Sequence, residues 1–212
     1  MLNKIFHVKR VFFVTLFFAT LITLVQADTL SGFNCMPDQI ETPKQKGLEI
    51  HGKLSGFDPC NNTVEFKVPS SSSKPSLMIS VHGGGGKKDA LKITNEFYKM
   101  GYATLIFDAY DMNSIPYGKI GNAYRQMMLL KTSYAAYKWV LNRPEIDNSK
   151  IFFYGISNGA STVLNLAGMV AFQIGDTEQS ISLLETAIAF RPDFVDASNN
   201  LGNVYKAIGD LD

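Results

Sequence analysis

The feature that most constrains the fold is a sharp turn between an apolar run and a helical pattern. Lys150–Tyr154 (KIFFY) reads as a buried strand, and the motif GISNG follows it at residues 155–159. Gly155 and Gly159 lack the Cβ atoms that would collide with neighbouring elements in a tight turn. The spacing predicts that Ser157 is held in a strained backbone conformation with its hydroxyl pushed into a cleft. Ser157 is therefore the candidate catalytic nucleophile, and Gly155 and Gly159 are the elbow glycines.

Two other short apolar runs come before this strand, at Ser76–Val81 and Gly101–Phe107. Patterns with helical spacing separate the three runs, at Asp89–Met100 and Gly121–Leu141. Alternation of strand and helix predicts an α/β fold with a parallel sheet, whose ligands bind at the carboxyl ends of the strands.

Two earlier segments alternate apolar and polar residues with a period of two. These are Gly47–Lys53 and Thr63–Val68. Such alternation is typical of strands with one buried face, so we expect two outer antiparallel strands that pair with each other.

A glycine-rich loop follows the first apolar run. The sequence there is HGGGG, from His82 to Gly86. It offers unhindered N–H groups, whereas the alternative is a flexible turn. We expect the backbone N–H groups of Gly84, Gly85 and Asn158 to form an oxyanion hole, Asn158 being at the N-terminus of a helix.

A general base is harder to find. His82 lies inside the glycine-rich loop and is interpreted as structural, His51 lies on an outer strand, and His7 lies near the N-terminus. The sequence contains no histidine after Ser157. No histidine is therefore well placed to act as the base.

Residues from about Leu48 to Ala160 resemble the N-terminal half of an α/β-hydrolase, in the esterase and dienelactone hydrolase-like branch. The matching segments are VHGGGG, GYATLIFDAYD, YKWVLNRPEID and FYGISNGAS. The resemblance implies acyl transfer on a small-molecule ester or lactone, with no cofactor. It also implies a triad in the order Ser, acid, His, with the last two on later loops. We therefore expect a hydrolase impaired by the absence of the triad acid and histidine.

From about Ser161 the chain resembles a tetratricopeptide repeat, whose period is 34 residues. Ala167-Gly168 and Ile174-Gly175-Asp176 recur 34 positions later as Leu201-Gly202 and Ile208-Gly209-Asp210. We expect two antiparallel helices, Ser161–Gln173 and Thr177–Phe190, and the start of a third. The fold class is therefore α/β, a partial α/β-hydrolase sheet with an all-α helical-repeat C-terminal segment.

Repeats of this family bind peptides, so the segment predicts a peptide or protein partner. The chain holds one repeat and part of a second, whereas about three make a stable stack. An alternative is a chimeric or truncated product without a selected function.

The predicted organisation has three parts: a signal peptide at residues 1–27, a truncated hydrolase domain at 28–160 and the repeat segment at 161–212. Lys4, Lys9 and Arg10 precede the apolar run Val11–Val25, and cleavage is expected after Ala27. An uncleaved membrane anchor is the alternative. The expected location is secreted or periplasmic, with membrane contact only through an uncleaved signal.

Cysteine content and net charge argue against a metal site and against nucleic-acid binding. Cys35 and Cys60 are candidates for one disulfide, and two separate thiols are the alternative. A metal site needs more ligands than these two, so none is expected. The formal net charge of +1 leaves no broad basic surface for nucleic acid.

Overall fold

The computed structural model describes residues 56–70, 73–118 and 120–209. The predicted signal peptide at residues 1–27 and the predicted strand Gly47–Lys53 lie outside the described residues. Within them, no helix combines the length and the apolar character that crossing a membrane requires.

A four-stranded mixed sheet forms the centre of the α/β region. Its strands are β1 (Glu65–Lys67), β2 (Leu77–Val81), β3 (Ala103–Ile106) and β4 (Ile151–Gly155), in the order β1-β3-β2-β4. β2 is parallel to β3 and β4, and β1 is antiparallel to β3. All five residues of β2 are buried, which agrees with its continuous apolar sequence. The predicted parallel core of the sheet is confirmed.

β1 is shorter than the predicted strand Thr63–Val68. Asn61 caps a turn that extends to Val64: its side-chain oxygen accepts the Thr63 N–H at 2.9 Å, and its carbonyl oxygen accepts the Val64 N–H at 3.0 Å. These N–H groups are used in the turn, so pairing with β3 begins at Glu65.

Three helices belong to the α/β region. α1 (Lys88–Lys99) packs against β2 and β3, and α3 (Asn122–Val140) packs beside the following helix and contacts β2. Both occupy the predicted positions. α2 (Ala109–Met112) is a single turn that the apolar pattern did not predict.

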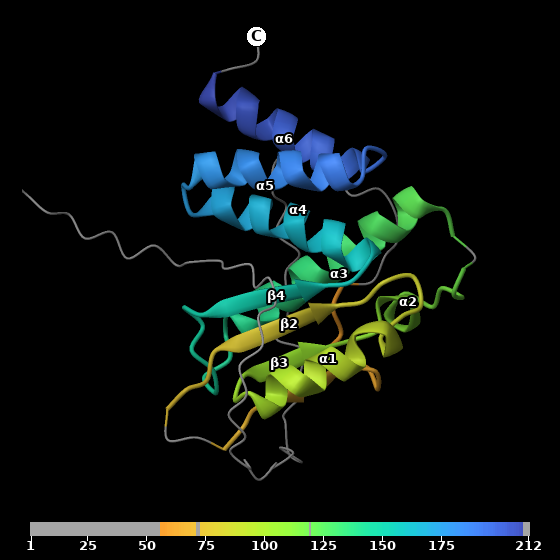
Figure 1. Ribbon diagram of the computed structural model, residues 1–212, viewed down its shortest axis with the longest axis vertical. Coiled ribbons are helices and arrows are strands. Elements are labelled where there is room, and N and C mark those ends of the chain that lie inside the picture. The colour runs from red at the N-terminus through yellow and green to blue at the C-terminus, as the bar shows by residue number, and fades with distance from the viewer. Residues whose placement is uncertain (1–55, 71–72, 119, 210–212) are drawn as a thin grey trace, which may run out of the picture.

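The repeat segment forms three successive helices. These are α4 (Asn158–Gln173), α5 (Thr177–Phe190) and α6 (Val195–Ile208), and they stack one beyond the other on the β4 side of the sheet (Figure 1). The Asp176 carboxylate accepts the Gln179 N–H at 3.1 Å and so caps α5. Gly175 and Gly209, 34 residues apart, both have positive φ, at 85° and 78°.

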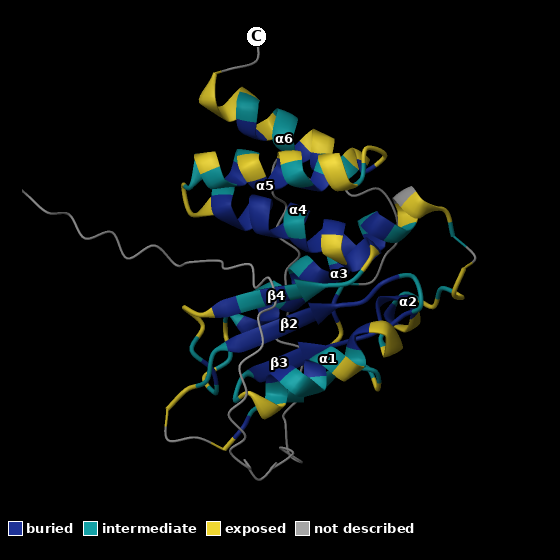
Figure 2. Cartoon of the chain, in the orientation of Figure 1, coloured by how far each residue is buried: buried dark blue, intermediate teal, exposed yellow. Residues whose placement is uncertain are grey.

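α4 is coloured largely as buried in Figure 2, and it touches both halves of the molecule. Twelve of its sixteen residues are buried, because it packs on β2, β4 and α3 and also against α5. One apolar core therefore runs from Leu77 in β2 to Ala197 in α6. The predicted domain boundary between residues 160 and 161 falls inside this helix, so the two segments share it.

Two glycines at the same repeat position have different surroundings. A Cβ at Gly168 would lie 2.7 Å from Leu184 Cγ, whereas a Cβ at Gly202 would have no described heavy atom within 4 Å. We predict that Gly168→Ala lowers the free energy of unfolding by about 1–3 kcal/mol, because α4 and α5 must separate. Gly202→Ala should raise it by about 0.5–1 kcal/mol through helix propensity. Urea unfolding of both variants checks this. An equal change in the free energy of unfolding for the two variants would contradict the close packing of α4 on α5 at Gly168.

Candidate functional site

Ser157 occupies the junction between β4 and α4 in an unusual backbone conformation. Its φ is 53° and its ψ is −118°, and its side chain is exposed. Among the described residues, Ser114 is the other non-glycine residue with positive φ. Such a conformation costs about 1–3 kcal/mol and persists where the surrounding structure enforces it.

The two elbow glycines let neighbouring backbone segments approach closely enough to hold Ser157 in this conformation. A Cβ at Gly155 would collide with the Gly159 carbonyl group, and a Cβ at Gly159 would collide with the carbonyl oxygen of Val81. The first turn of α4 therefore lies directly against the end of β2. Larger residues at either position would push the helix off the sheet.

The glycine-rich loop lies beside Ser157. A Cβ at Gly83 would be 3.2 Å from Ser157 Cβ, so the loop and the elbow are in close contact. Among the described residues, the N–H groups of Gly84 and Asn158 have no hydrogen-bond partner. The Gly85 N–H, in contrast, donates to Asp89 Oδ2 at 2.7 Å. The predicted oxyanion role of Gly85 would require that bond to break.

His82 has both ring nitrogens in use. The Ala109 N–H donates to Nε2 at 2.9 Å, so the proton is on Nδ1, which lies 2.7 Å from the Gly83 carbonyl oxygen. The ring is fully buried and stacks on Tyr110, and burial lowers the pKa of the imidazole. A neutral, saturated imidazole cannot serve as a base for Ser157. His82 instead ties the glycine-rich loop to α2.

Asp108 is a functional neighbour that sequence reasoning missed. Its Oδ1 accepts the N–H groups of Tyr110 and Asp111 and so caps α2, while its Oδ2 accepts the Lys87 N–H at 2.9 Å and the Tyr117 hydroxyl. Burial raises the pKa of this carboxyl, but the hydrogen bonds outweigh it and leave the pKa lowered. Asp108 therefore holds the Lys87 end of the glycine-rich loop and the start of α2. In the sequence, the position of Asp108 directly after the predicted strand Gly101–Phe107 could have indicated this role.

Arg191 is a second residue that sequence reasoning missed, because it belongs to the repeat. It ends α5, and its Nη2 donates to the side-chain oxygen of Asn158. Since a guanidinium only donates, the Asn158 amide nitrogen must face the other way. That nitrogen would be 3.7 Å from a Cβ at Gly84. The repeat thus orients a side chain of the elbow.

A groove of about 480 Å³ is lined by Ser157 and by residues of β4, α4 and the end of α5. Its volume is in the range of small-molecule sites. The lining residues include Phe153, Ser157, Val163, Leu164, Phe190 and Arg191. A ligand here would touch both the elbow and the repeat.

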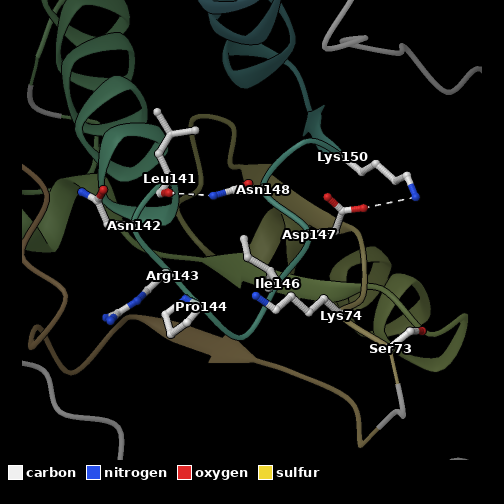
Figure 3. A pocket seen from close by; sticks show the side chains of 10 residues that line it. All are labelled: Ser73, Lys74, Leu141, Asn142, Arg143, Pro144, Ile146, Asp147, Asn148 and Lys150. Atoms are coloured by element: carbon white, nitrogen blue, oxygen red, sulfur yellow. Dashed lines mark hydrogen bonds and ion pairs between the residues drawn. The ribbon is translucent and has the colours of Figure 1, made fainter. Parts of the chain in front are cut away.

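A larger hollow of about 610 Å³ lies at the other end of the sheet (Figure 3). Its lining residues lie before β2 and in the turn between α3 and β4, and they include the ion pair of Lys150 Nζ with Asp147 Oδ2 at 3.1 Å. These are the amino ends of the strands, opposite Ser157. We assign no chemistry to this open, charged hollow.

Two other predictions concern metals and cysteines. Across residues 56–70, 73–118 and 120–209, no three His, Cys, Asp or Glu side chains are grouped to hold a metal ion. Cys35 lies outside the described residues, so the disulfide with Cys60 stays a prediction.

Comparisons with known proteins concern both halves of the chain. A family model described as a TPR repeat matches residues 168–209. A crystal structure of dienelactone hydrolase from Anabaena variabilis matches with 15% identity, 60% coverage of this chain, 74% coverage of that chain and a TM-score of 0.43. The structure of DcsB in complex with its substrate analogue matches with 23% identity, 46% and 34% coverage and a TM-score of 0.37. No curated protein sequence matches. The predicted tetratricopeptide repeat is confirmed, and α4 joins it to the α/β region.

Removing the Cβ at Ser157 tests the backbone conformation. Ser157→Gly should raise the free energy of unfolding by about 1 kcal/mol relative to wild type, because glycine tolerates this φ. Ser198→Gly, at an exposed helical position in α6, should lower it by about 0.5 kcal/mol. Urea unfolding at neutral pH measures both. A loss of stability in Ser157→Gly like that in Ser198→Gly would place Ser157 in an ordinary helical conformation.

The buried His82 predicts a pH dependence of stability. Its pKa in the folded chain is below the ordinary value of 6.5. Below pH 6.5 the unfolded chain therefore takes up a proton that folded His82 does not, and the free energy of unfolding falls as pH decreases. His82→Gln should flatten this dependence between pH 7 and the folded pKa, although it lowers stability at pH 7. Urea unfolding at each pH measures this. If the free energy of unfolding changed equally with pH in wild type and His82→Gln, the lowered pKa of His82 would be refuted.

Proposed function

We propose that this chain is a secreted serine hydrolase-like protein of the esterase or lactonase type, with Ser157 as the nucleophile and with impaired turnover. The observation that carries the proposal is the strained, exposed Ser157 at the strand-to-helix turn. It lies against Gly83 and lines a groove large enough for a small substrate. Export is proposed from the basic and apolar pattern of residues 1–27.

The chemistry begins with attack of Ser157 Oγ on the carbonyl carbon of a small ester or lactone. The developing oxyanion would accept hydrogen bonds from the N–H groups of Gly84 and Asn158, which have no other described partner. Asn158 is also the first residue of α4, so the positive end of the helix dipole faces the same point. These groups favour the tetrahedral intermediate over the substrate.

The weak step is removal of the Ser157 proton. His82 is engaged at both nitrogens, and the sequence has no histidine after Ser157. A serine without a base is a poor nucleophile. We therefore propose that the rate does not exceed about 10³–10⁴ over the reaction in water, the level left by binding and oxyanion stabilisation when a triad member is missing.

A second candidate function is repeat-mediated interaction with a peptide or protein. α6 supports it, because the face around Gly202 has no described atom packed on it, whereas the matching face around Gly168 in α4 is covered by α5. A helix from a partner would suit that position. This function and a weak hydrolase activity are compatible.

The proposal predicts slow, site-specific phosphonylation of Ser157, in which an O–P bond forms and fluoride leaves. Intact protein incubated with an alkyl fluorophosphonate should gain one adduct, located at Ser157 by peptide mapping. Ser157→Ala should abolish the adduct. Ser198→Ala should not, because that exposed serine has an ordinary helical backbone.

Two results would count against separate parts of this function. Absence of an adduct at Ser157 would remove the nucleophile. Rapid hydrolysis of p-nitrophenyl acetate that depends on Ser157 would instead show that a base is present and that turnover is not impaired.

A further inference from the structure

The groove beside Ser157 combines one hydroxyl group with apolar walls. Ser157 lines it together with Phe153 from β4 and Val163 and Leu164 from α4, which are apolar. Phe153 and Val163 are buried by the core behind them, so these walls are held firmly in place. A ligand with a polar reacting end and an apolar remainder fits this arrangement.

The opposite wall comes from the repeat. Phe190, the last residue of α5, lines the groove and is 75% exposed, the largest exposed fraction of the large apolar side chains in the described ranges. An apolar chain lying along α4 would cover part of this ring. Burying such surface is favourable by roughly 25 cal/mol per Å².

Arg191 is the charged side chain among the residues that line the groove, and it already has partners. Arg191 donates to the Asn158 side-chain oxygen, and its Nε lies 3.9 Å from Asp193 Oδ1. The guanidinium is therefore directed toward the elbow and Asp193. These two contacts partly satisfy the guanidinium and so reduce its attraction for an anion.

We propose that the groove binds the uncharged acyl chain of the substrate, with its carbonyl carbon at Ser157 and with Phe190 of the repeat as the outer wall. This proposal rests on the proposed function, whose substrate class it narrows. It makes the repeat segment part of the binding site.

Octanamide and acetamide test the groove, because these amides bind without reacting. Each methylene that becomes buried should tighten binding about fourfold, so octanamide should bind much more tightly by isothermal titration calorimetry. Binding of these amides requires no reaction at the Ser157 hydroxyl. Failure of labelling at Ser157 and failure of octanamide binding are therefore separate outcomes.

Two pairs of variants locate the bound chain. Ala160 is exposed and lines the groove, so Ala160→Phe should fill it and abolish octanamide binding, whereas Ala207→Phe on exposed α6 should not. Phe190→Ala should weaken binding at least tenfold, and Val195→Ala, also exposed but outside the groove, should leave it unchanged. Circular dichroism of each variant verifies the fold.

Several results would overturn the proposal. One is octanamide binding no more tightly than acetamide, and another is undiminished binding in both Ala160→Phe and Phe190→Ala. Tighter binding of octanoate than of octanamide would show that Arg191 selects an anion. A second copy of the chain paired on β4 would block the groove and would also overturn the proposal. Analytical ultracentrifugation would detect it as a dimer.

Discussion

The close approach of α4 to the end of β2 determines the rest of this structure. The approach is possible because Gly159 presents no side chain to the carbonyl oxygen of Val81. It fixes the N-terminus of α4 at the carboxyl edge of the sheet, where ligands bind in α/β folds. It also forces the preceding residue, Ser157, into positive φ and brings it against Gly83. The candidate site is thus a direct consequence of one backbone contact.

The same helix then serves a second purpose further along its length. At Gly168 it lies close to Leu184 of α5, and the Ser180 hydroxyl donates to the Gly168 carbonyl oxygen at 2.8 Å. The first half of α4 therefore belongs to the elbow and the second half to the repeat. Arg191, at the end of α5, donates a hydrogen bond to Asn158 and so links the repeat to the elbow. The repeat is consequently packed into the site rather than attached as a separate module.

Sequence patterns predicted the parts of the fold that depend on local chemistry. The apolar run at Ser76–Val81 and the helix Thr177–Phe190 were found because a buried strand leaves a continuous apolar run and the repeat leaves a pattern that recurs after 34 residues. α2 was missed because a single turn capped by Asp108 has no period. The contact of Arg191 with Asn158 was also missed, since it joins residues 33 positions apart through packing that no local pattern records. The fate of the Gly85 N–H likewise depended on the rotamer of Asp89.

If α4 makes the sheet and the repeat one cooperative unit, their backbone amides must become exposed together. Native-state hydrogen exchange measures this residue by residue. The account predicts that the slowest amides of β2, α4 and α5 exchange with the same free energy, equal to that of global unfolding in urea. Exchange of the α5 amides at a free energy several kcal/mol below that of β2 would contradict it, because the repeat would then unfold while the site stayed intact.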